Sequence, residues 1–499
     1  MKYTQRLLTG VLALGGLCAL LGTGAPGLVS AATPRPTPTP IPVKSPTTLP
    51  YPAYGTPAPG VRQTQPNPAV PTQITLQQAI DIAAAKSPIL AAARADYNIS
   101  TVPVQLAKSA IFPNVAAVGS IARSNGGRSG GSNSGTGGST TTLGSSGSTN
   151  ESLQLTLRQL IFDGGKTVAL IHSARATEAA AAGTYERNLQ LLSFNVAQAY
   201  YNALQAQAAT QLAARVVQQN VVQENLIRAQ IRAGTEARAS LLAAEVPTAQ
   251  ARVALVRAQG TEISADAAFA NELGLDANTA VLPVNDTPAG AAASLLKVPV
   301  LGYDTAVTRA LALRPDYLAS QHTVDAAKYS LRAAKLGRFP TLTGTADAGT
   351  SSTTPNGGDF RSSNSIGASL NIPIFDQGVT AAQSAQAQYQ LDKANAQLES
   401  TRIGLELNVR QALAGLISSQ AATQQTAVEL ANATEQVKAT QAQYRAGVTN
   451  LPLLLQAQLG LTQAETDRLN AVYLLRQSEQ TYLFAIGESD LATGQPATP

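Results

Sequence analysis

The sequence lacks most of the side chains that bind metals, form disulfides or perform catalysis. Its 499 residues include one cysteine, two histidines and no tryptophan. His172 and His322 are solitary, so neither predicts a metal site. We find no glycine-rich phosphate loop, and no serine, histidine and acid in a catalytic pattern. We therefore expect a protein that is not an enzyme and that holds no cofactor and no metal.

Charge is scarce as well. Charged residues make up 13% of the chain, the formal net charge is +5, and no run of lysine or arginine is present. A nucleic-acid-binding surface needs a dense basic patch. The composition therefore excludes nucleic acid as an expected partner.

Long apolar runs are missing except at the N-terminus. There Lys2 and Arg6 precede an apolar run over residues 7–21, and small residues follow at 30–32. This order is typical of a secretory signal peptide, here with cleavage near Ala31 or Ala32, rather than of a helix of the mature fold. No later stretch reaches about 18 uncharged apolar residues, so we expect no transmembrane helix.

The single cysteine, Cys18, lies inside this apolar run. A lipoprotein site needs a small residue directly before its cysteine, and Leu17 occupies that place. We therefore expect no lipid anchor and a mature chain without thiols or disulfides. Residues 33–71, rich in proline and threonine, predict an extended linker without a core.

The chain is duplicated. An offset of 227 residues relates two pairs of motifs: the helical segments around Pro88 and Pro315, and the Phe-Pro pairs at 112–113 and 339–340. Ile-Phe-Asp at 161–163 and 374–376 and Arg-Ala-Gly at 232–234 and 445–447 share an offset of 213 residues. Four motifs in one order with two fixed spacings indicate an internal repeat.

Each repeat has the order helix, strand, loop, strand, long helix, turn and helix. The expected division is signal peptide 1–31, linker 32–71, first repeat 72–280, linker 281–302, second repeat 303–488 and a flexible tail 489–499. The long tracts 164–231 and 377–444 have 68 residues each, which corresponds to about 100 Å of α-helix. In each repeat two shorter tracts have a combined length close to that of the long tract. They are 74–108 with 235–273 in the first repeat and 303–337 with 448–486 in the second. We therefore expect long hairpins whose second layer is built from two shorter pieces.

Four strand-like stretches are expected at about 114–124, 152–162, 341–350 and 365–375. Leucines alternate with polar residues over 153–158, and apolar residues alternate with small or polar ones over 366–374. About ten residues is the length of a tilted membrane-crossing strand. A soluble, half-buried hairpin is the alternative. Phenylalanine stands at each strand–helix junction, where it is expected at a membrane interface: Phe112, Phe162, Phe339 and Phe375.

Four strands are too few to close a barrel, and open strand edges are not tolerated in lipid. The chain must therefore combine its strands with those of other copies. Two copies supply eight strands and three supply twelve, and the periodicity does not choose between them.

Over residues 72–488 these features resemble the TolC-type outer-membrane efflux proteins. The resemblance lies in the duplicated order of Phe-Pro, strand, loop, strand, Phe-Asp-x-Gly and long helix, and in the tip segments QIRAGTEARASLLAAE and QYRAGVTNLPLLLQAQ. It implies a mainly α fold and a homotrimer with a twelve-strand barrel in the outer membrane. The barrel continues into an α-helical tunnel across the periplasm. A polar, weakly charged chain suits the wall of such a duct.

The family further implies an exit duct for drugs, small toxic molecules or secreted proteins. Its partners are a periplasmic adaptor protein, an inner-membrane pump of the RND, ABC or MFS type, and outer-membrane lipid. The competing class is a structural or adhesive periplasmic coiled-coil protein without a channel. That class does not account for the duplicated ten-residue strands at the helix ends.

The Arg-Ala-Gly segments are then turns at the periplasmic tips, where the family constricts the duct and docks the adaptor. Gly234 and Gly447 are expected in the left-handed conformation, with Thr235 and Thr449 or Asn450 capping the next helix. The candidate tip residues are Arg232, Ala233, Gly234, Thr235, Glu236, Arg238, Tyr444, Arg445, Ala446, Gly447, Val448, Thr449, Leu453 and Gln456. A turn with no partner role is the alternative.

The second tip departs from the family pattern. Tyr444 matches, but the basic position is Thr449 and the acidic positions are Leu453 and Gln456. We therefore expect weak cation selectivity and a closure that depends on Tyr444, Arg445 and packing. One hypothesis pairs Glu236 or Glu245 with Arg232, Arg238 or Arg445. The alternative is solvated surface charge, since exposed ion pairs contribute only about 0–1 kcal/mol.

Overall fold

Eight helices and six strands make up the described part of the chain. The computed structural model describes residues 73–125, 147–279, 281–284, 300–354 and 359–488, so the signal peptide, most of the linkers and the tail lie outside it. The first repeat contains β1 (Gln73–Ile74), α1 (Leu76–Lys86), α2 (Pro88–Ser109), β2 (Asn114–Asn125), β3 (Gly147–Phe162), α3 (Lys166–Arg232), α4 (Arg238–Glu272) and β4 (Leu282–Pro283). The second contains α5 (Tyr303–Leu313), α6 (Pro315–Lys335), the 3-10 turn η1 (Leu336–Arg338), β5 (Thr341–Thr354), β6 (Arg361–Asn371), α7 (Val379–Arg445) and α8 (Leu451–Ile486).

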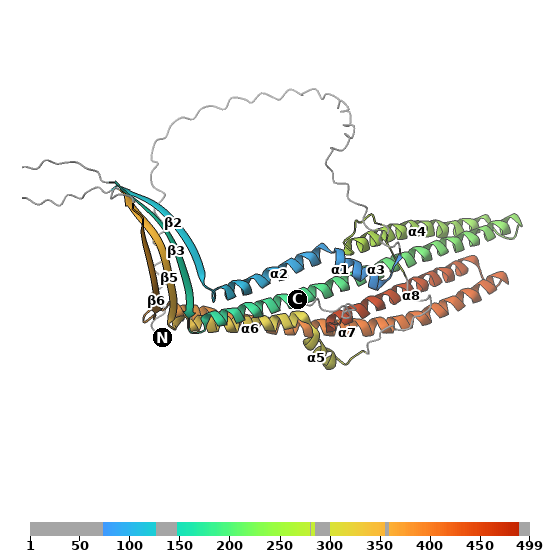
Figure 1. Ribbon diagram of the computed structural model, residues 1–499. Coiled ribbons are helices and arrows are strands. Elements are labelled where there is room, and N and C mark those ends of the chain that lie inside the picture. The colour runs from blue at the N-terminus through green and yellow to red at the C-terminus, as the bar shows by residue number, and fades with distance from the viewer. Residues whose placement is uncertain (1–72, 126–146, 280, 285–299, 355–358, 489–499) are drawn as a thin grey trace, which may run out of the picture. The chain divides into compact units, whose positions relative to one another are not determined.

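The two long helices have the predicted length and position. Helices α3 and α7 have 67 residues each, and both are packed along their length by two shorter helices. Helices α2 and α4 pack on α3, and α6 and α8 pack on α7, so the second layer is built from two pieces as the tract lengths predict (Figure 1). Within the described chain no helix is both long and apolar enough to cross a membrane.

One prediction about the helices was wrong. The tracts 74–108 and 303–337 were each expected as one helix, but each is two, α1–α2 and α5–α6. Pro88 and Pro315 occupy the first position of the second helix in each pair, where the missing N–H needs no partner and the preceding residue is extended. Ser87 caps α2 by accepting a hydrogen bond from the Leu90 N–H at 3.4 Å.

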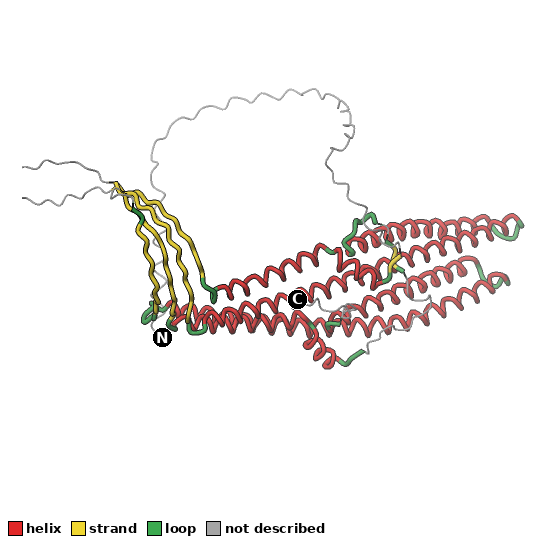
Figure 2. The backbone as a smooth tube through the Cα atoms, viewed as in Figure 1, coloured by secondary structure: helices red, strands yellow, loops and turns green. Residues whose placement is uncertain are grey.

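Strands β2, β3, β5 and β6 form one antiparallel sheet in that order (Figure 1), and the sheet is drawn in yellow in Figure 2. Asn114 pairs with Arg158 in the first hairpin, and Thr341 pairs with Asn371 in the second. The two pairs occupy equivalent positions in the two repeats. Residue 341 lies 227 positions after 114, and residue 371 lies 213 positions after 158. The duplication is therefore kept in the register of the strands. Strand β6 ends at Asn371, before the expected end at 375.

Equivalent turns lead from the sheet into the long helices. Asp163 accepts hydrogen bonds from the N–H groups of Gly165 at 3.0 Å and Thr167 at 2.6 Å. Asp376 does the same for Gly378 at 3.1 Å and Thr380 at 2.8 Å. The prediction that these acids cap the long helices is confirmed, because each carboxylate satisfies N–H groups that have no partner within the helix.

The core is repeated as well. In the first repeat Phe269, Leu273 and Val196 are fully buried beside α1. Their counterparts in the second repeat, at an offset of 213, are Tyr482, Ile486 and Val409, which are fully buried beside α5. The short helices α1 and α5 thus close the two hydrophobic clusters that hold the hairpins to the rest of the fold.

A buried ionic cluster joins the repeats beside the second hydrophobic cluster. Arg314, whose side chain is 5% exposed, contacts Asp316 through Nε at 3.0 Å and Nη2 at 2.5 Å, and donates to the Ala485 carbonyl at 3.4 Å. Arg187 from α3 approaches Asp316 at 3.8 Å. Burial and the charge of Arg314 lower the pKa of Arg187 to about 10. Two arginines thus share one carboxylate at the end of α8.

Candidate functional site

The first tip is a tight turn between α3 and α4. Gly234 has φ of 77°, and the Thr235 N–H donates to the Gln230 carbonyl at 3.0 Å. The left-handed glycine is confirmed. The prediction that Thr235 caps α4 was wrong, because its hydroxyl donates back to the Gln230 carbonyl at 3.0 Å and α4 begins three residues later, at Arg238.

The second tip has the same geometry between α7 and α8. Gly447 has φ of 72°, and the Val448 N–H donates to the Gln443 carbonyl at 2.9 Å. Of the two residues proposed as caps, Asn450 serves, accepting from the Leu453 N–H at 3.2 Å. Pro452 lies in the first turn of α8, as expected.

A tyrosine joins the two tips. The Tyr444 hydroxyl at the end of α7 donates to Glu236 Oε1 at 2.9 Å, while Gln230 Oε1 lies 3.3 Å away. Ser240 donates to the other carboxylate oxygen at 2.8 Å. We name Tyr444, Glu236, Ser240 and Gln230 the tip latch. It connects hairpin α3–α4 to hairpin α7–α8 about 100 Å of helix away from the sheet.

The latch shifts the pKa values of its members in opposite directions. Hydrogen bonds from Ser240 and Tyr444 lower the pKa of Glu236. Burial and the adjacent Glu236 carboxylate raise the pKa of Tyr444 to about 12. Around neutral pH the latch therefore holds an ionised acceptor and a protonated donor, which is the stronger form of such a hydrogen bond.

A small apolar cluster packs against the latch. Ile227, Ala244 and Leu451 are buried between the tips, and Tyr444 and Leu455 pack against them. The ring of Tyr444 is thus held by packing while its hydroxyl bonds Glu236. Packing and a hydrogen bond thus both hold Tyr444 against the first tip.

The acids of the first tip have other partners than the hypothesis assigned. Glu245 lies 3.3 Å from Arg228, one helical turn before the end of α3, and Glu236 is taken by the latch. In the described residues Arg232, Arg238 and Arg445 form no ion pair with either acid. The hypothesis is therefore wrong within one protomer, because Glu245 pairs with Arg228 and Glu236 accepts from Tyr444 and Ser240 instead.

The remaining candidate residues surround the turns. Val448 is 76% exposed and Leu453 is 46% exposed, while Ala233 and Ala446 end the long helices. Gln456 lines a groove of about 830 Å³ between the two hairpins, with residues of α3, α4, α7 and α8. The groove wall combines amide and aliphatic side chains. Neither this groove nor the roles of Gln230 and Ser240 were anticipated, although Gln230 and Gln443 stand at the same place in the two tip segments.

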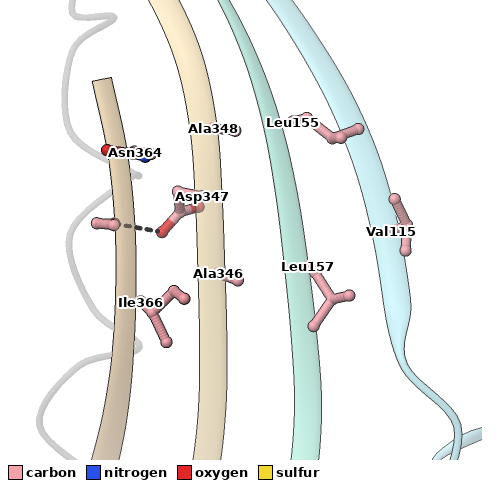
Figure 3. Close-up of a pocket in the computed structure, with 9 residues that line it drawn as sticks. Val115, Leu155, Leu157, Ala346, Asp347, Ala348, Asn364 and Ile366 are labelled. Atoms are coloured by element: carbon pink, nitrogen blue, oxygen red, sulfur yellow. Dashed lines mark hydrogen bonds between the residues drawn. The ribbon is translucent and has the colours of Figure 1, made fainter. Parts of the chain in front are cut away.

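The sheet has one apolar and one polar face. Val115, Leu157, Ala346 and Ile366 are paired across the four strands and share one face (Figure 3). Ile366 is 92% exposed there. On the other face Asp347 accepts from Ser365 at 3.4 Å and from Gln154 at 3.3 Å.

The four phenylalanines lie where the strands meet the helices: Phe162 is the last residue of β3, and Phe375 lies between β6 and α7. Their exposed fractions are 68% for Phe112, 52% for Phe162, 45% for Phe339 and 85% for Phe375. Phe339 packs on Gly164, whose φ is 68° and where an added Cβ would lie 2.6 Å from the phenylalanine side chain. Only a residue without a side chain allows this approach.

A β-sheet with one apolar and one polar face, joined to long paired helices, is the architecture of an outer-membrane channel protein. The family model described as outer membrane efflux protein matches residues 79–275 and 306–488. The chain belongs to this family, whose members are channels and not enzymes, and it is an outer-membrane efflux channel that extends into the periplasm. The family implies a trimer that works with an efflux system.

Relatives agree over most of the chain. Protein CyaE of Bordetella pertussis is 28% identical over 89% of this chain and 90% of its own length. Outer membrane protein TolC of Escherichia coli is 27% identical over 69% and 71%. The solved structure of CusC superposes with a TM-score of 0.72 at 20% identity, covering 83% of this chain and 92% of that one. VceC of Vibrio cholerae gives 0.67 at 18% identity, covering 83% and 96%. The structures share the fold.

The latch predicts a pH-dependent channel. A carboxylate whose pKa is lowered in the latched state stabilises that state above its ordinary pKa and stops doing so as the pH falls through the lowered value. Because the ordinary pKa of Glu236 is 4.5, conductance in planar bilayers should be constant from pH 8 to about 5. It should rise below about pH 4. A conductance that falls steadily with acid would contradict the latch.

Proposed function

We propose that the two tips form the closed periplasmic mouth of the duct, held in each protomer by the tip latch. The observation that carries this proposal is the hydrogen bond from Tyr444 to Glu236, which joins the ends of the two hairpins at the turns. Opening of the mouth separates the two hairpins. This movement must break the latch hydrogen bond and the apolar contacts around Tyr444. The mouth has Thr449, Leu453 and Gln456 where the family pattern has charges, so its cation selectivity is weak.

The apolar face of the sheet, with Val115, Leu157 and Ile366, is placed toward lipid in this proposal, and the face with Asp347 lines the duct. The junction phenylalanines then lie at the periplasmic interface of the membrane, where aromatic rings are favoured. The chain reaches this place through a signal peptide cleaved near Ala31 or Ala32.

The exposed tip residues Arg445, Gly447 and Val448 dock the periplasmic adaptor, which connects the duct to an inner-membrane pump of the RND, ABC or MFS type. The pump selects the cargo, and the duct conducts it passively. Drugs, small toxic molecules and secreted proteins are all compatible with a polar wall of low charge.

Photo-crosslinking in cells tests the docking surface. A photoreactive amino acid at Val448, which is 76% exposed, should crosslink to a periplasmic adaptor that mass spectrometry identifies by its sequence. The same probe at Tyr389, which is 72% exposed in the first half of α7, is the matched control and should not. Equal capture at both sites, or none at Val448, would contradict docking at the tips.

A further inference from the structure

The charged residues of the four-strand sheet are divided unevenly between its two faces. Cross-strand partners share a face, and every second residue of a strand returns to it. Arg158 of β3 pairs with Thr345, two residues before Asp347 on β5, so both charged side chains lie on the polar face. Arg361 of β6 pairs with Ser351, four residues after Asp347, and lies on the same face. Among the residues of these strands that the structure describes, no other charged residue lies there.

The apolar face is balanced by contrast. Within the described strands its charged residues are Arg123 of β2 and Glu151 of β3, one of each sign. Ile121 pairs with Glu151, and Arg123 stands two residues further along β2 on the same face. An excess of positive charge is therefore confined to the polar face.

The two arginines of the polar face are not neutralised within the chain. Asp347 lies one diagonal step from Arg158, but its Oδ1 accepts from Gln154 at 3.3 Å and its Oδ2 from Ser365 at 3.4 Å (Figure 3). Both Arg158 and Arg361 are exposed, and neither forms an ion pair with any described residue. Two arginines thus stand against one aspartate, which leaves one excess positive charge in each chain.

The helical tips do not offset this excess. The segments 232–240 and 445–453 contain three arginines and a single acid, Glu236. The Glu236 carboxylate is already occupied by Tyr444 and Ser240. Among the described residues Arg232 and Arg445 form no ion pair. The sheet and the tips therefore both have more positive than negative charge.

We propose that the duct prefers anions to cations, and that Arg158 is the main residue that sets this preference. The inference rests on the proposed function, in which the face with Asp347 lines the duct. Unpaired positive charge on a water-filled wall concentrates anions and repels cations. Its range is the Debye length, about 8 Å at 0.15 M salt. The cargo that such a duct favours carries carboxylate, sulfate or phosphate groups, or no charge at all.

Arg158 has the stronger position of the two arginines. It lies in a middle strand of the sheet, between β2 and β5, and four residues before Phe162 at the end that leads into α3. Arg361 is the first residue of β6, at the opposite end of the sheet. In the trimer that the family implies, three copies of Arg158 form a ring where the helical tunnel meets the barrel. Each planar guanidinium can donate two hydrogen bonds to a carboxylate or phosphate that passes.

Reversal potentials across planar bilayers in a KCl gradient test the preference. The native channel should have a chloride-to-potassium permeability ratio of about 2–3 at about 0.05 M salt. The ratio should approach one at about 1 M, where the Debye length is about 3 Å. Arg158→Gln should bring the low-salt ratio close to one, and Asp347→Asn should raise it about twofold. Arg158→Lys should keep the native ratio, because it keeps the charge.

The matched control is Arg123→Gln, the same substitution on the apolar face of the sheet. It should leave the permeability ratio unchanged. A native channel that prefers potassium, or an Arg158→Gln channel with the native ratio, overturns the inference and leaves the duct standing. A larger change in Arg123→Gln than in Arg158→Gln overturns the inference together with the assignment of the two faces. A native oligomer that passes no current overturns the proposed function itself.

Discussion

Replacing Tyr444 by phenylalanine is expected to raise the open probability and mean conductance of the reconstituted channel several-fold. The ring keeps its packing against Ile227 and Leu451, but the hydrogen bond to Glu236 is lost. A hydrogen bond of this kind contributes about 1 kcal/mol at a partly exposed site, which shifts the ratio of open to closed states about fivefold in each protomer. Single-channel recording in planar bilayers measures the change directly.

The control is Tyr389→Phe, which removes the hydroxyl of an exposed tyrosine on the same helix. It should leave the conductance unchanged. Glu236→Gln should resemble Tyr444→Phe, since a neutral amide is a weaker acceptor than a carboxylate. If both tip variants conduct like the native channel, the latch does not hold the mouth closed.

Replacing Arg314 by methionine is expected to cause a large loss of stability. The arginine is buried, binds both oxygens of Asp316 and satisfies the Ala485 carbonyl at the end of α8. Breaking a fully buried ion pair costs about 3–5 kcal/mol, and we expect about 2–3 kcal/mol here because Asp316 is 30% exposed and keeps Arg187 as a neighbour. The apparent melting temperature of the helical circular dichroism signal in detergent should fall by several degrees.

A nearby arginine provides the comparison. Arg309 on α5 pairs with Glu488, and its side chain is 47% exposed. Arg309→Met should change the melting temperature little, because exposed pairs contribute only about 0–1 kcal/mol. Equal losses for the two variants would show that the buried cluster has no special role.

Features that repeat along the chain were predictable from the sequence. The offsets of 227 and 213 residues, first seen between proline and Arg-Ala-Gly motifs, recur in the strand register, where Asn114 pairs with Arg158 as Thr341 does with Asn371. Glycine at Gly234 and Gly447 and acids at the start of the long helices act locally, so their roles follow from a few neighbouring residues. Local backbone chemistry and periodicity are what one sequence reveals best.

Contacts between distant elements were less accessible. Glu236 was expected to pair with an arginine, but its partner Tyr444 is 208 residues away. The polar neighbour that an acid contacts depends on how two long helices are rotated about their axes. Small residues lie on all sides of these helices, so the sequence pattern does not determine that rotation. The break at Ser87 and Arg314 was missed for another reason. A proline is compatible both with the first turn of a new helix and with a kink in a continuous one.

The central claim is that this chain forms a conducting duct whose mouth is closed at the helical tips. Its most direct test is the current through a planar lipid bilayer after addition of the purified native oligomer. The account predicts discrete steps of small unitary conductance at neutral pH, which disappear when the oligomer is first dissociated by heat. A stable oligomer that inserts into the bilayer and never conducts, even below about pH 4, would contradict it.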